Sequence, residues 1–200
     1  MTQYLKSIGD IIRMRYLEKH LPQATGKMKC LDAGAGFGHY REMIERKGYQ
    51  YYGVDIKVSD KFIKRADISL EIPFKDNFFG VVISIDVIEE IERDRDAIAE
   101  IYRVLKRGGE LFLHTPNSEQ THILAYFPDN PNHVRKGYTE EELYKILSVF
   151  TKVDILPTFN ILECIAWEIV NLKGTINFSR LLDFDIVKYE NLGWLARCVK

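Results

Sequence analysis

Short apolar runs alternate along the chain with segments in which apolar residues recur at helical spacing. The runs are rich in β-branched and aromatic residues and predict seven strands, at 29–33, 49–56, 64–68, 80–87, 110–114, 152–156 and 195–199. Helical spacing predicts helices at 4–20, 39–47 and 139–149, and a further helix that starts at Asp94 or Asp96 and ends before Gly108. Strands that alternate with helices indicate an α/β domain with a mostly parallel sheet and helices on both faces.

Two segments depart from this rhythm. The 11 residues between Asp55 and Asp67 are too few for a full helix and a strand, which indicates a shortened crossover. Residues 159–192 form a long stretch before the last strand, and we interpret them as a helical insertion within a single domain over residues 1–200. The apolar side chains of this stretch, among them Trp167 and Phe178, suit a lid on the sheet edge, an acceptor pocket for an apolar molecule, or a dimer surface. We hypothesise that it is a partly mobile cover over the acceptor pocket.

A glycine-rich turn, Asp32-Ala-Gly-Ala-Gly-Phe-Gly38, follows the first strand and opens a helix. Glycines let a ligand approach the backbone closely, and a helix N-terminus offers unpaired N–H groups to a carboxylate or phosphate. Asp55 closes the second strand, where an acidic side chain can accept hydrogen bonds from ribose hydroxyls. Together these features predict a site for a nucleoside-containing cofactor.

The glycine spacing separates two classes of cofactor. A dinucleotide fingerprint that starts at Gly34 needs its third glycine at position 39, which is His39. The third glycine is Gly38 instead, and an acid, Asp32, precedes the turn. This arrangement resembles motif I of the class I S-adenosylmethionine-dependent methyltransferases.

The resemblance continues over residues 66–117 and covers about 29–156 in all. The segment is similar to the small-molecule methyltransferases of the ubiquinone and menaquinone biosynthesis type. The motifs that carry the likeness are Asp67, Ile72-Pro-Phe74, Phe78-Phe-Gly80, Val87–Glu90, Glu100–Gly109 and the stretch from His133 to Leu143.

The resemblance also implies roles for individual residues. The methionine part of the cofactor would lie against Asp32 and the loop from Gly34 through Gly36 to Gly38, with Ile85 and Asp86 at its border. Asp55 would accept the ribose hydroxyls, and Ile56 would pack on the adenine. Asp67 would accept a hydrogen bond from the adenine amino group. Ile68 would pack against the adenine ring, with its backbone N–H nearby.

Acid–base residues are harder to assign. The family's histidine after the fourth strand is Glu90 here, which places a histidine-dependent mechanism in question. Candidates for a general base are His133, His114 and Glu90, together with Glu89, and both glutamates also fit a solvated helix end. His114 equally fits a hydrogen-bonded imidazole near the core. Tyr138 and His133 are candidate substrate-binding residues, and packing is the alternative for Tyr138.

Composition and charge narrow the partners. The chain has 28 basic and 29 acidic residues and a formal charge of −1, which does not favour a nucleic-acid partner. Its three cysteines form no C-x-x-C pair, so we expect neither a disulfide framework nor a metal site. No apolar run reaches the roughly 20 residues that span a bilayer, and the N-terminus lacks the features of a signal peptide. We expect a cytoplasmic monomer or homodimer, and peripheral membrane contact stays open.

These observations lead to one prediction and two alternatives. We predict a Rossmann-like, doubly wound, seven-stranded and mostly parallel sheet, with the last strand antiparallel beside the fifth. The predicted activity is methyl transfer from S-adenosyl-L-methionine to a small-molecule or lipid-linked acceptor. The alternatives are a nicotinamide-dependent oxidoreductase, which His39 disfavours, and an S-adenosylmethionine-binding protein without catalysis, which Glu90 keeps open.

Overall fold

The computed structural model describes residues 8–58, 60–119, 134–158 and 193–200, with the backbone alone for residues 8–12. Its elements follow one another as α1 (Ile8–His20), β1 (Lys29–Ala33), α2 (Arg41–Arg46), β2 (Gln50–Asp55), β3 (Ile63–Arg65), β4 (Phe79–Ile85), the 3₁₀ turn η1 (Ile88–Glu90), α3 (Asp94–Val104), β5 (Leu105–Pro116), α4 (Glu140–Ile146), β6 (Lys152–Thr158) and β7 (Gly193–Val199).

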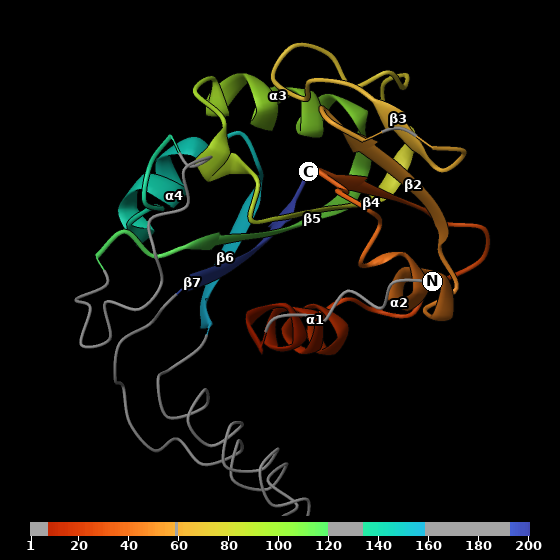
Figure 1. Cartoon of the computed structure of the whole chain (residues 1–200), viewed down its shortest axis with the longest axis horizontal. Coiled ribbons are helices and arrows are strands. Elements are labelled where there is room, and N and C mark those ends of the chain that lie inside the picture. The colour runs from red at the N-terminus through yellow and green to blue at the C-terminus, as the bar shows by residue number, and fades with distance from the viewer. Residues whose placement is uncertain (1–7, 59, 120–133, 159–192) are drawn as a thin grey trace, which may run out of the picture.

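The strands form one sheet of seven in the order β3-β2-β1-β4-β5-β7-β6. The first five strands of the chain pair in parallel, and β7 runs antiparallel between β5 and β6. Helices α1 and α2 cover one face of the sheet, and α3 and α4 cover the other (Figure 1). The predicted Rossmann-like α/β fold is therefore confirmed, including the antiparallel last strand beside the fifth.

Side chains of the central strands alternate between two cores because successive residues of a strand point to opposite faces. Val82 lies in the core beneath α3 and α4, whose other members include Leu31, Leu111, Leu113, Ile98 and Leu143. Its neighbours Val81 and Ile83 lie in the core beneath α1 and α2, with Cys30, Phe112, Leu17 and Met43. Both faces of the sheet are thus buried, which explains the nearly continuous apolar sequence of β4.

The predicted start of the fifth strand was wrong. β5 begins at Leu105, five residues before position 110, and α3 ends at Val104 rather than at Gly108. Lys200 supplies hydrogen bonds to carbonyl groups at the end of this helix, since its Nζ donates to the carbonyl oxygens of Tyr102 and Leu105 at 2.7 Å each. The glycine pair lies instead in an irregular part of β5, where the register against β4 shifts.

The helix at 139–149 begins as predicted. Thr139 Oγ1 accepts a hydrogen bond from the Glu142 N–H at 3.1 Å, and Glu142 Oε2 accepts one from the Thr139 N–H at 2.8 Å. This reciprocal pair is the expected capping box. The predicted insertion at 159–192, with Trp167 and Phe178, and the candidate residue His133 lie outside the described residues. No helix in the described part of the chain is long and apolar enough to cross a bilayer.

Candidate functional site

The glycine-rich turn lies directly after β1, at the carboxyl end of the parallel strands. Gly34, Gly36 and Gly38 have φ angles of 87°, 51° and 74°, which side chains rarely adopt. A Cβ on Gly34 would lie 2.3 Å from Cγ2 of Val87, so this glycine is needed for packing against the residues after β4. A Cβ on Gly36 would meet no atom of the described chain within 4 Å. Gly36 therefore presents open backbone at this edge.

Asp55, at the end of β2, holds this turn through backbone amides. Its Oδ2 accepts from the Gly36 N–H at 2.9 Å, and its Oδ1 accepts from the Lys57 and Val58 N–H groups at 2.8 and 3.0 Å. A carboxylate offers about four lone-pair positions, so Oδ2 can still accept one outside donor, such as a ribose hydroxyl. Two hydroxyls on Asp55 would require the release of one of these amides.

Asp32 lies behind the turn rather than in front of it. Its carboxyl is buried in β1, and its Oδ2 accepts a hydrogen bond from the Tyr51 hydroxyl at 3.1 Å. Burial and, to a smaller extent, the nearby charge of Asp55 raise the pKa of Asp32 to about 7, against the opposing effect of the Tyr51 hydrogen bond. Asp32 is thus a group that a nearby cation would ionise near neutral pH.

Apolar side chains are exposed beside this polar edge. Ile56, just after β2, is 52% exposed, and Leu70, in the turn after β3, is 64% exposed. Between them, Asp67 Oδ1 accepts from the backbone N–H and the hydroxyl of Ser69, at 2.9 and 2.7 Å. Ile68 is buried in the core, so it would offer a ligand its backbone and not its side chain. The arrangement suits a flat heterocycle with polar edges.

A network of four side chains occupies the other half of the carboxyl edge. Asp86 follows the half-buried Ile85 at the end of β4, and its φ of 53° is in the left-handed region. Its Oδ2 pairs with Arg13 Nε of α1 at 2.9 Å, and its Oδ1 lies 2.5 Å from His114 Nδ1 of β5. His114 Nε2 lies 2.9 Å from the Thr158 hydroxyl at the end of β6. The predicted residues Asp86 and His114 are therefore in direct contact, and sequence reasoning missed Arg13 and Thr158.

The solvated role predicted for Glu89 was wrong, whereas Glu90 is exposed as expected. Glu89 is fully buried in η1, where its Oε2 accepts from the Thr115 hydroxyl at 3.0 Å, and its Oε1 has no hydrogen-bond partner among the described residues. Burial, together with the nearby charge of Asp86, raises the pKa of Glu89 well above its usual range. Despite these carboxyls, the described residues contain no group of three His, Cys, Asp or Glu side chains that could hold a metal ion.

The structure favours packing for Tyr138. Its ring is fully buried, and its hydroxyl donates to Asp94 Oδ2 at 2.9 Å and lies 3.2 Å from the Ile88 carbonyl. Trp194 Nε1 also donates to the Tyr138 carbonyl at 3.0 Å. A side chain with no exposed surface does not line an open acceptor pocket, so the substrate-binding role proposed for Tyr138 is not supported by its position.

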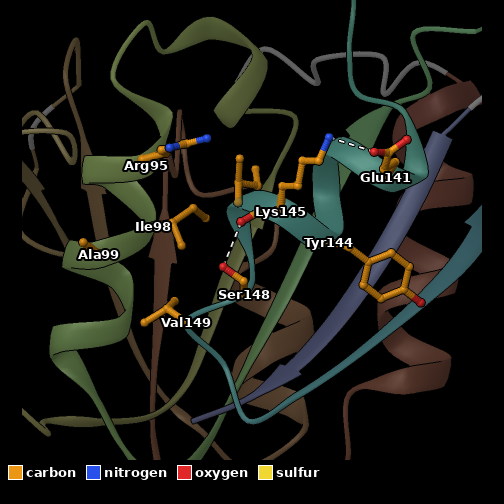
Figure 2. Close-up of a pocket in the computed structure, with 9 residues that line it drawn as sticks. Arg95, Ile98, Ala99, Glu141, Tyr144, Lys145, Ser148 and Val149 are labelled. Atoms are coloured by element: carbon orange, nitrogen blue, oxygen red, sulfur yellow. Dashed lines mark hydrogen bonds and ion pairs between the residues drawn. The ribbon is translucent and has the colours of Figure 1, made fainter.

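A shallow groove of about 650 Å³ lies between α3 and α4, away from the glycine turn. Figure 2 shows Arg95, Ile98 and Ala99 of α3 on one side, and Glu141, Tyr144 and Lys145 of α4 on the other. None of the predicted cofactor residues lines this groove. Because nucleotides bind at the carboxyl ends of strands in open α/β sheets, we place the candidate site at the glycine turn and not in the groove.

A parallel sheet with a glycine turn after its first strand and an acid after its second defines a Rossmann-like domain of the nucleoside-binding type. Comparison with known families then identifies the domain: residues 31–113 match the family described as "Methyltransferase domain". This part of the chain is thus similar to a methyltransferase domain, in agreement with the predicted class I resemblance.

Individual relatives agree with this assignment. The chain is 34% identical over 141 residues to the mitochondrial ubiquinone biosynthesis O-methyltransferase of Rattus norvegicus, and the match covers 58% of this chain but only 41% of that protein. A solved S-adenosylmethionine-dependent methyltransferase from Archaeoglobus fulgidus has a TM-score of 0.70 at 20% identity, over 95% of this chain and 94% of its own. Phosphoethanolamine N-methyltransferase 2 of Haemonchus contortus, solved with S-adenosyl-L-methionine, has a TM-score of 0.67 at 18% identity, over 94% of this chain and 52% of its own. At these identities the two structures show a shared fold.

Proposed function

We propose that this chain transfers a methyl group from S-adenosyl-L-methionine to a small-molecule or lipid-linked acceptor. The observation that carries the proposal is the open backbone of Gly36 beside the partly satisfied carboxylate of Asp55. Close backbone approach and a charged acceptor for a ribose hydroxyl are what a nucleoside cofactor requires. The match of residues 31–113 to the methyltransferase family favours S-adenosyl-L-methionine over other nucleoside cofactors.

The proposed contacts follow the carboxyl edge from β4 to β3. Ile85 borders the methionine part, which lies over the loop from Gly34 to Gly38, and the buried Asp32 beneath this loop ionises in response to the positive charges of the cofactor. Asp55 accepts a ribose hydroxyl. The adenine lies between exposed Ile56 and the turn at Asp67 and Ile68, where a carboxylate oxygen and a backbone N–H are at hand.

The acceptor belongs on the β4–β5 side of the sheet, because the methyl-bearing sulfur lies beyond the ribose on that side. Methyl transfer displaces a thioether from a sulfonium, so the protein contributes mainly alignment of acceptor and methyl group. Polar groups on this side include Asp86, His114, Glu90 and, outside the described residues, His133. The acceptor class rests on the likeness to ubiquinone biosynthesis O-methyltransferases.

Two experiments test this function, the first on cofactor binding and the second on turnover. Calorimetry with S-adenosylmethionine, S-adenosylhomocysteine and NAD⁺ should give binding of the first two and none of the third. Release of S-adenosylhomocysteine is then measured on a panel of catechols, carboxylic acids and primary amines. Binding of NAD⁺ alone would support the oxidoreductase alternative, and cofactor binding without turnover across a broad panel would support the non-catalytic one.

A further inference from the structure

The contact between Asp86 and His114 links the cofactor edge to three distant elements. On the cofactor side, Val87 packs against Gly34, which leaves no room there for a Cβ. On the other side, Asp86 holds Arg13 of α1 and His114 of β5, and His114 in turn contacts Thr158 of β6. Asp86 is therefore placed between the proposed cofactor loop and the acceptor side of the sheet.

The network constrains the backbone at two positions, Asp86 and Gly193. Asp86 adopts a φ of 53°, in the left-handed region that residues with a side chain disfavour. Gly193, at the start of β7, lies so close that a Cβ there would be 2.8 Å from His114 Nε2 and 2.9 Å from Thr158 Oγ1. Non-glycine residues with such backbone angles cluster at functional sites, because the surrounding structure must hold them in place.

The network also orients the histidine. A carboxylate can only accept, so with Asp86 ionised beside Arg13 the proton of the 2.5 Å contact lies on His114 Nδ1. In the neutral imidazole, Nε2 then accepts from the Thr158 hydroxyl at 2.9 Å. Arg13 Nε forms an ion pair with the second oxygen of Asp86 at 2.9 Å. Both carboxylate oxygens are thereby held in one orientation, while the Asp86 side chain keeps 25% of its surface exposed.

Glu89 is a second carboxyl group near Asp86, and burial together with the charge of Asp86 raises the pKa of Glu89. Glu89 is fully buried with its Oε2 on the Thr115 hydroxyl, and burial favours its neutral form. Burial thus favours the neutral form of one carboxyl group, whereas its neighbour Asp86 pairs with the Arg13 guanidinium, and a difference of this kind is typical of acid–base sites. The carboxyl group that pairs with Arg13 is the one with an exposed surface.

We infer that Asp86 is the residue that receives the proton of the acceptor's O–H or N–H group, with His114 and Arg13 as its positioning residues. This inference rests on the proposed methyl transfer. As the acceptor's oxygen or nitrogen forms its bond to the methyl carbon, the carbon–sulfur bond breaks and its electron pair stays on sulfur, which leaves a neutral thioether. The acceptor's proton passes to the Asp86 carboxylate and from its exposed side to water.

A first experiment needs no acceptor. In ¹⁵N-labelled protein, the resonance of the His114 Nδ1 proton reports on Asp86, and D86N should remove or strongly shift it. If Asp86 faces the transferring methyl, this resonance should differ between the S-adenosylmethionine and S-adenosylhomocysteine complexes, because only the former carries the sulfonium charge. The Trp194 Nε1 proton, bonded to the Tyr138 carbonyl, is the control and should be alike in both. The same His114 resonance in both complexes would overturn the inference, whereas failure to bind either cofactor would overturn the proposed function itself.

A second experiment measures turnover on any panel acceptor that is methylated. D86N should fold, since asparagine tolerates the left-handed region, and should lower kcat at least about 100-fold with little change in KM for S-adenosylmethionine. H114A should lower kcat about 10- to 100-fold through lost orientation, and H114N should recover much of it, because its amide N–H can replace Nδ1. T158V, which leaves the contact between His114 and Asp86 intact, should lower kcat by less than about tenfold. Wild-type kcat in D86N, or equal losses in H114N and H114A, would contradict these roles.

Discussion

The two halves of the carboxyl edge are built from different kinds of contact. The half that ends β1 and β2 is held by backbone amides, as in the bonds from Gly36, Lys57 and Val58 to Asp55. The half that ends β4 and β5 is held by side chains, in the network that runs from Arg13 to Thr158. Backbone contacts of the first kind suit a part of the ligand that every member of a family shares. Side-chain contacts of the second kind can change with single substitutions, so they suit the part where chemistry differs.

A buried carboxyl group with a raised pKa lies in each half, Asp32 in the first and Glu89 in the second. Substitution of Asp32 should have the largest effect. Its pKa is raised from 3.8 to about 7, so the folded chain keeps a proton that the unfolded chain releases. The stability from this group is fully present below pH 3.8 and is lost as the pH rises through 7. Asp32→Asn should therefore reduce the loss of stability between pH 4 and pH 8 by up to about 4 kcal/mol.

Urea unfolding at several pH values measures this loss for the Asp32 variant. The matched control is Glu42→Gln, whose side chain is 88% exposed and whose removal should leave the pH slope unchanged. An Asp32→Asn protein with the wild-type slope would show that this carboxyl is already ionised when folded.

Gly34→Ala should destabilise the junction between the two halves by about 3 kcal/mol or more, because a Cβ would overlap Val87 in a strained backbone region. Gly26 has a φ of 66° and no atom of the described chain within 4 Å of its Cβ position. Gly26→Ala therefore carries the backbone strain without the overlap and should cost about 1–2 kcal/mol. If thermal unfolding shows equal losses of stability in the two variants, the packing role of Gly34 is contradicted.

Gly36→Val should separate binding from folding. The variant has space for its side chain and should stay folded, but the branched Cβ stands where the ligand approaches, so affinity for S-adenosylmethionine should fall at least about 100-fold. Gly108→Val, at a φ of 70° with similar open space, is the control for backbone strain and should bind normally. Calorimetry that finds normal affinity in the Gly36 variant would reduce the loop to a tight turn.

Asp55→Ala should weaken cofactor binding by about 1–3 kcal/mol, because a ribose hydroxyl loses a charged acceptor and the Gly36 amide loses its anchor. Asp60→Ala removes a carboxylate that caps the Phe62 and Ile63 amides nearby, and it should leave affinity almost unchanged. Titration of the two folded variants with S-adenosylhomocysteine compares them. Equal affinities would place the ribose elsewhere.

The difference between the halves also explains what the sequence could predict. The glycine turn and Asp55 are local signals, since a strand, its turn and the end of the next strand lie close together in the chain. The capping box at Thr139 and Glu142 is local as well. These features, and the order of strands and helices, were predicted without knowledge of tertiary contacts.

The second half depends on contacts that no local pattern encodes. In the sequence, Arg13 is one of several charged residues on a predicted helix. Its ion pair with Asp86 forms only because α1 packs beside the end of β4, which the sequence pattern does not reveal. Glu89 looks like a solvated residue at a helix end until η1 places it against Thr115. The start of β5 was missed for a similar reason, because Lys200, the last residue of the sequence, satisfies the end of α3. The predicted cover at 159–192 stays a prediction.

The pairing of Thr158 with Gly193 has a consequence for how such a chain can diversify. These residues are partners at the ends of two adjacent antiparallel strands, so the two residues that flank positions 159–192 lie side by side in the sheet. The entropy of closing a loop grows only slowly with its length, about 0.6 kcal/mol for each doubling. Segments of other lengths and sequences can therefore be exchanged at this junction with little strain on the sheet. The junction lies beside His114, because Thr158 Oγ1 is 2.9 Å from His114 Nε2, so such exchanges would take place next to the side-chain network and away from Asp55.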